Sequence, residues 1–71
     1  MVLRSNTFYS IPNSSMMILI LSVLHQDEDS AKLHVAYVSK QNGNAFGMER
    51  IEVKKENIKH WEETNNIPFT F

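Results

Sequence analysis

The run Met16-Met17-Ile18-Leu19-Ile20-Leu21-Ser22-Val23-Leu24 decides the fold of this chain, because eight of its nine residues are apolar. Turn-forming Pro, Asn and Ser residues precede the run, and Asp27-Glu28-Asp29 follows shortly after it. Since the run has no polar stripe at helical spacing, it predicts a strand that is buried on much of both faces. It is too short to span a membrane, which takes about 20 apolar residues. Its flanks are also unlike those of a signal peptide.

An alternating segment follows the acidic turn and predicts the partner of this strand in a hairpin. Lys32–Ser39 alternates between two faces, because successive side chains of a strand point to opposite sides. One face carries Leu33, Val35 and Tyr37, and the other carries His34, Ala36 and Val38. The pattern leaves open which face points inward, since a one-residue shift of register exchanges the two.

A further strand is expected in residues Ala45–Lys54, after the dipeptide Asn42-Gly43, which favours a type I′ turn. In this segment Ile51 and Val53 have the opposite parity to Phe46 and Met48. A regular strand cannot bring all four side chains to one face. We therefore expect a β-bulge near Gly47–Glu49 that bends the strand.

The two ends of the chain give shorter signals. Residues 1–6 are expected to be a weakly ordered lead-in. Thr7–Ile11 is rich in β-branched and aromatic residues, so it predicts a first strand that stops at the turn Pro12–Ser15. Ile67–Phe71 predicts a last strand, which Pro68 restricts to a sheet edge.

Between the fourth and fifth of these strands, the spacing of Ile58 and Trp61 predicts a single helical turn within residues 55–63. The fold class is then all-β, a small five-stranded antiparallel sheet that closes on itself to protect its edges. The order of elements and their lengths over residues 7–71 resemble those of SH3-like small barrels. The acidic and aromatic loop pattern of peptide-binding SH3 domains is missing, so their polyproline specificity is not implied. An all-β meander with an appended helix is the alternative.

Length and composition exclude several classes of function. The chain has 71 residues, with 7 Lys and Arg against 8 Asp and Glu, which gives a net charge of -1. One domain of this size buries only about 60% of its unfolded surface, so a deep catalytic pocket would compete with the core. We therefore expect no enzymatic activity and no cofactor. The lack of cysteine excludes disulfides, thiolate metal sites and thiol catalysis, and is compatible with a cytoplasmic protein.

Histidines and acids near the hairpin turn suggest a metal site that we do not favour. If the turn centres between Asp29 and Ser30, His25 and His34 lie opposite one another, with Cβ atoms about 5 Å apart. They could then share a metal ion with Asp27 or Asp29. Two solvent-facing histidines beside a soluble acidic turn explain the same residues. A calcium loop would need an internal glycine and more alternating oxygen ligands, so no metal site is predicted.

Basic and aromatic residues gather in the second half of the chain. Cations that track a phosphate backbone, with aromatic rings on which bases stack, are typical of nucleic-acid surfaces. Interleaved glutamates largely cancel these cations, and the near-neutral net charge disfavours binding by phosphate neutralisation. Trp61 is also suited to plugging one open end of the barrel. The residues concerned are Phe46, Arg50, Lys54, Lys55, Lys59, His60 and Trp61.

These observations favour a non-catalytic binding module or accessory protein, of the kind common in bacteria and their phages. Its partner would be another protein or a second copy of the chain, held through an exposed sheet edge or an aromatic-rich face. The residues expected to contact the partner are Tyr37, Phe46, Arg50, Lys54, Lys55, Lys59 and Trp61. The alternative is a regulator that binds nucleic acid through the segment Arg50–Lys59.

Overall fold

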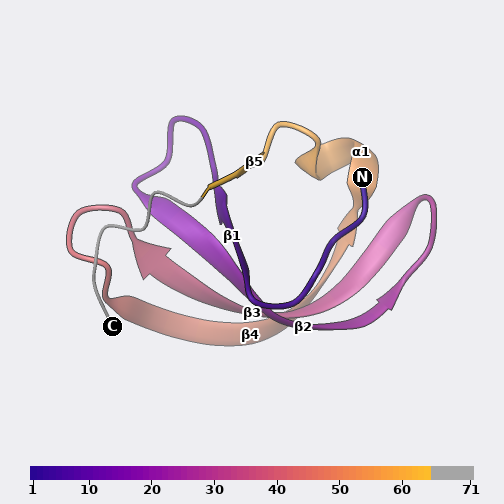
Figure 1. Cartoon of the computed structure of the whole chain (residues 1–71), viewed down its shortest axis with the longest axis horizontal. Coiled ribbons are helices and arrows are strands. Elements are labelled where there is room, and N and C mark those ends of the chain that lie inside the picture. The colour runs from indigo at the N-terminus through magenta and orange to yellow at the C-terminus, as the bar shows by residue number, and fades with distance from the viewer. Residues whose placement is uncertain (65–71) are drawn as a thin grey trace.

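The computed structural model describes residues 1–64 as one strongly curved antiparallel sheet (Figure 1). Its elements are β1 (Thr7–Ser10), β2 (Met16–Gln26), β3 (Ser30–Ser39), β4 (Ala45–Lys54), α1 (Lys55–Ile58) and β5 (Glu62–Glu63). The strands lie in the order β4-β3-β2-β1-β5. The segment before β1, together with α1 and β5, lies across the hollow of the sheet.

The predicted all-β fold with five antiparallel strands and one short helical turn is confirmed. The predicted closure into a barrel is wrong for the described residues, because β4 and β5 are the two edges of the sheet and do not pair with one another. The physical reason is the length of β5, whose two residues pair only with Tyr9 and Ser10 of β1. The predicted strand Ile67–Phe71 lies outside the described residues.

β2 and β3 form the predicted hairpin, but two irregularities in β2 change its register. Ile20 lies opposite Val35 and Ser22 opposite His34, so Leu21 is an extra residue. Leu24 is a second extra residue further along β2. Each bulge reverses the phase of the strand and increases its bend. Because the two bulges change which face successive residues point to, the apolar run of β2 shows no regular alternation. The bulges also help to curve the sheet.

The main core lies on the concave face. It consists of Leu3, Tyr9, Ile18, Ile20, Ala31, Leu33, Val35 and Ile58. Leu3 belongs to the segment before β1, from which the sequence analysis named no core residue. The side chain of Gln26 holds this segment in place: its Oε1 accepts from the Leu3 backbone N–H at 3.1 Å, and its Nε2 donates to the Leu3 carbonyl at 2.8 Å.

A smaller apolar cluster lies on the opposite, convex face of the sheet. Phe8, Met17 and Val38 are buried there, with Leu19 packed against them. Since Met17 and Ile18 are buried on opposite faces, the first half of β2 is buried on both sides, as its composition predicts. The second half, from Leu21 onward, has no fully buried residue.

β4 contains the predicted bulge, one residue earlier than expected. Gly47 lies opposite Tyr37 and Ala45 opposite Val38, so Phe46 is the extra residue. The bulge brings the ring of Phe46 onto Tyr37 on the concave side. Met48 stays on the convex side, opposite Ala36. The expectation that the bulge brings Met48 to the same face as Ile51 is therefore wrong.

The loop before β4 is longer than a two-residue type I′ turn. The Gly43 N–H donates to the Ser39 carbonyl at 2.9 Å, and the Ser39 N–H donates to the Asn44 carbonyl at 3.0 Å. Of the pair Asn42-Gly43, only Gly43 is left-handed, with φ of 73°. A type I′ turn needs positive φ at both positions, so the predicted turn type is wrong.

The predicted helical turn is confirmed as α1. Ile58 is buried in the main core, and Trp61 packs against the same cluster. The Trp61 N–H donates to the Ile58 carbonyl at 2.9 Å, which fixes the two side chains on one side of the turn. None of the helices in residues 1–64 has the length and apolar character needed to cross a membrane.

Candidate interaction surface

Among the strands longer than two residues, β4 is the most exposed. It is an edge of the sheet, with β3 on one side and no other strand beside it among residues 1–64. Only Ile51 and Val53 of its ten residues are partly buried, and the other eight are exposed. An edge of this length presents a row of backbone N–H and C=O groups with which another extended chain can pair.

Two large apolar side chains on β4 are unusually exposed. Phe46 is 62% exposed and Met48 is 68% exposed. Their positions differ, because Phe46 leans on Tyr37 of the concave face while Met48 lies opposite Ala36 on the convex face. A strand added beside β4 would therefore find an apolar contact on each side of the sheet.

Tyr37 ties β3 to β4 at this point. Its ring stacks with Phe46 at a centroid distance of 6.3 Å and an interplanar angle of 24°. Its hydroxyl donates a short hydrogen bond to Oε1 of Glu49. Burial, together with the Glu49 carboxylate, raises the pKa of Tyr37 to about 12, so the hydroxyl keeps its proton at neutral pH.

A second aromatic pair lies on the same concave face, near the opposite edge of the sheet. Tyr9 and Trp61 have ring centroids 6.0 Å apart at a tilt of 46°. Burial raises the pKa of the Tyr9 hydroxyl, and Glu63 raises it further against the opposing effect of Arg4. Trp61 is half-buried against the main core, although the open sheet has no closed barrel end for it to plug. Its contribution to partner binding stays a prediction.

The structure separates the basic side chains from the aromatic rings. Ile51 packs against the main core, so its neighbours on β4 at even positions, Arg50 and Lys54, point to the convex side. Phe46 and Trp61 both lie on the side of the concave core. Lys55 and Lys59 belong to α1 and its C-cap. The predicted mixture of cations and stacking rings is therefore not brought together on one face.

The acidic turn between β2 and β3 is built around one carboxylate. Oδ1 of Asp27 accepts hydrogen bonds from the backbone N–H groups of Asp29 and Ser30, both at 2.8 Å. These two donors, in that order, are the main reason why the pKa of Asp27 lies below its ordinary value. The turn also receives the Lys55 N–H at the Asp29 carbonyl, at 2.8 Å, so it anchors the start of α1.

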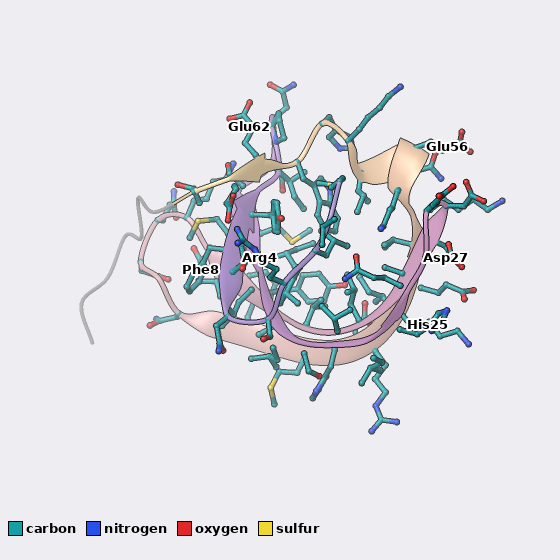
Figure 2. The ribbon with its side chains drawn as sticks, turned by 45° about the vertical axis from the view of Figure 1, so that its right-hand side comes forward. Arg4, Phe8, His25, Asp27, Glu56 and Glu62 are labelled. Carbon is teal, nitrogen blue, oxygen red and sulfur yellow. The ribbon has the colours of Figure 1, made fainter. Side chains whose placement is uncertain are left out.

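The hypothesis that His25 and His34 face each other is wrong. His25 lies opposite Lys32 and His34 opposite Ser22, because the turn centres one residue earlier than assumed and Leu24 is inserted between them. His25 instead lies 3.9 Å from Asp27, in an exposed pair. Figure 2 shows both side chains at the same end of the molecule as Glu56 of α1. Residues 1–64 contain no group of three or more side chains able to hold a metal ion.

Met48, Ile51 and Glu52 are features of this edge that the sequence analysis did not include in the binding surface. Local pattern could identify β4 as a strand, but its position at an edge depends on the path of the whole chain. The available signal was the number of charged residues in the segment, Glu49, Arg50, Glu52 and Lys54, since edge strands commonly carry charge.

In comparisons with known proteins, no protein family matches the chain, and no curated protein or solved structure matches it significantly.

Proposed function

We propose that the protein is a non-catalytic binding module that holds an extended segment of a protein partner against β4. In this mode, called strand addition, backbone hydrogen bonds supply affinity and alternate side chains supply selectivity. The observation that carries the proposal is the ten-residue edge strand β4, in which eight residues are exposed, Phe46 and Met48 among them.

The uneven distribution of exposed apolar side chains supports this role. The exposed large hydrophobic residues among those described are Met1, Val2, Leu24, Phe46 and Met48. Met1 and Val2 lie in the segment before β1, and among the strands only β4 carries two of these residues, which lie within three residues of one another. Scattered single residues need no explanation, whereas apolar side chains gathered on a free backbone edge are suited to a partner.

The proposal also includes an SH3-like fold and a cytoplasmic accessory role. An SH3-like arrangement is supported by α1, which lies between the fourth and fifth strands, and by the pairing of β5 with β1. The domain differs from a closed barrel at the seam between β4 and β5, which is where we place the partner. A cytoplasmic accessory role of the bacterial or phage kind rests on small size and the lack of cysteine.

A displayed library of random peptides, selected on the immobilised protein, tests the proposal. We expect extended, apolar peptides whose addition slows amide exchange in β4 and whose binding tolerates moderate salt. The double variant Phe46→Ser/Met48→Ser should lose this binding. The matched control Leu24→Ser removes a residue that is 51% exposed on β2 and should retain it.

Two results would contradict the proposal. The first is binding that perturbs other strands and leaves β4 amides unchanged. The second is steeply salt-dependent binding of a random single-stranded oligonucleotide that the charge reversals Lys54→Glu, Lys55→Glu and Lys59→Glu abolish together. That second result would favour the nucleic-acid alternative, in which the segment Arg50–Lys59 is the contact.

A further inference from the structure

We propose that the partner of β4 is β4 of a second copy of this chain, paired antiparallel about a two-fold axis that passes through Ile51. This inference rests on the proposed function, because it names the occupant of the same edge. It is argued from the length of the pairable segment and from charge complementarity.

Symmetry limits the possible registers of such a pair. Side chains that lie opposite one another across two strands share a face of the sheet. A two-fold axis perpendicular to the sheet therefore has to pass through a residue, and not between two residues, or the concave face of one copy would continue into the convex face of the other. Each register is then named by the residue on the axis.

The regular part of β4 restricts the choice further. Its ladder with β3 is continuous from Gly47 to Lys54, between the bulge at Phe46 and the start of α1 at Lys55. An axis at Arg50 or at Ile51 pairs seven residues of this segment with their counterparts. An axis at Glu49 or Glu52 pairs only five, so length alone leaves two main candidates.

Charge separates these two candidates. An axis at Arg50 places two guanidinium groups against one another, and the shorter registers place Glu49 or Glu52 against its own copy. An axis at Ile51 places two isoleucines in contact on the concave face. It also places each Arg50 opposite Glu52 of the second copy, so that two opposite-charge pairs flank the axis. Like charges directly opposite one another destabilise strand pairs, and opposite charges stabilise them.

The neighbouring strand extends this pattern. Glu52 lies opposite Lys32 of β3, and Arg50 lies opposite His34. Across the two-fold axis, the row on the convex face then reads Lys32, Glu52, Arg50 and His34 through four strands. The end pairs of the register place the apolar stem of Lys54 beside the exposed Met48 of the second copy. No like-charged carboxylates or ammonium groups lie directly opposite one another at the interface.

A seven-residue strand pair is a small interface. Interfaces below about 1,200 Å² of total buried area belong to weak and transient complexes, so the dimer is expected to depend on protein concentration. Since both charge pairs recur by symmetry, a single substitution changes two contacts. Reversal of either charge is expected to weaken the dimer by about tenfold or more, because two attractive cross-strand pairs become repulsive.

The test uses sedimentation equilibrium of the full chain over a range of concentrations up to about 1 mM, so that a Kd as weak as millimolar is detected. The wild-type protein should dimerise, whereas Arg50→Glu alone and Glu52→Arg alone should dimerise with a Kd that is higher by about tenfold or more. An equimolar mixture of these two variants should form a heterodimer, because each Glu of one chain then faces an Arg of the other. The double variant Arg50→Glu/Glu52→Arg should dimerise again. Circular dichroism of each variant checks that it is folded.

A monomeric wild-type protein would overturn the inference, as would single variants that dimerise as well as the wild type. A mixture that fails to associate while both variants are folded would overturn the register. If the wild-type protein is monomeric but selected peptides still protect β4 amides, the second copy is excluded and strand addition stands. If neither association nor peptide protection occurs at β4, both proposals fail together.

Discussion

β3 and β4 are two strands of the same length that pair with one another, yet they differ in almost every measure of burial. Five of the ten residues in β3 are buried, and none of the ten in β4 is. Both segments alternate apolar and polar residues over part of their length. The difference arises because β3 has a neighbour on each side and β4 has one. Burial in a small sheet is therefore decided by strand order, which is a property of the whole chain.

Leu33 and Ile51 offer the sharpest way to measure this difference, because they lie opposite one another across the two strands. Leu33 is fully buried in the main core, and Ile51 is only partly buried at its margin. We expect Leu33→Ala to destabilise the protein by about 2–5 kcal/mol, through lost apolar contacts and a residual cavity. Ile51→Ala should reduce the free energy of unfolding by less than about 2 kcal/mol.

Urea unfolding at low protein concentration measures both values without a contribution from association. Should Leu33→Ala not fold, the milder Leu33→Val can be compared with Ile51→Val. Equal losses of unfolding free energy at the two positions would contradict this difference in burial. They would show that β4 is packed as tightly as β3.

The loop that joins β3 to β4 supplies the next largest effect. Gly43 is left-handed, and a side chain with a β-carbon is strained there by roughly 1–2 kcal/mol. We expect Gly43→Ala to lower the free energy of unfolding by about 1 kcal/mol and Gly43→Asn by less, because asparagine tolerates this conformation. Thermal unfolding of the two variants checks the order. An alanine variant as stable as the asparagine variant would argue against the left-handed backbone.

The sequence was informative where the signal is local. The hairpin of β2 and β3, the turn at Pro12 and the helical packing of Ile58 with Trp61 follow from alternation, turn residues and spacing, and all are present. The two bulges in β2 were not predicted, because an unbroken apolar run hides a change of phase. That failure also explains the incorrect placement of His25 opposite His34.

The candidate surface was less predictable than the fold. Tyr37 and Phe46 were both expected to contact the partner, and the bulge in β4 brings their rings together. Arg50, Lys54 and Trp61 were grouped because they are near in sequence, but alternation and the helical turn send them to different sides of the sheet. The closing of the barrel depended on a strand at residues 67–71, which lies outside the described residues. Non-local contacts of this kind leave no periodic signal in the sequence.

The smallest expected effect concerns the hydrogen bond that joins Tyr37 of β3 to Glu49 of β4. Because burial and Glu49 raise the Tyr37 pKa from 10.0 to about 12, folding favours the protonated hydroxyl. The stability from this preference is fully present below pH 10 and is lost as the pH rises towards 12. Glu49→Gln removes the charge but keeps an acceptor, so it should lower the Tyr37 pKa while stability at neutral pH changes little.

Titration of the Tyr37 ring by NMR checks this, with Glu52→Gln as the matched control on the same strand. An unchanged Tyr37 pKa in Glu49→Gln would mean that burial alone accounts for the shift, and that the edge strand is held to β3 by its backbone ladder without help from this side-chain contact.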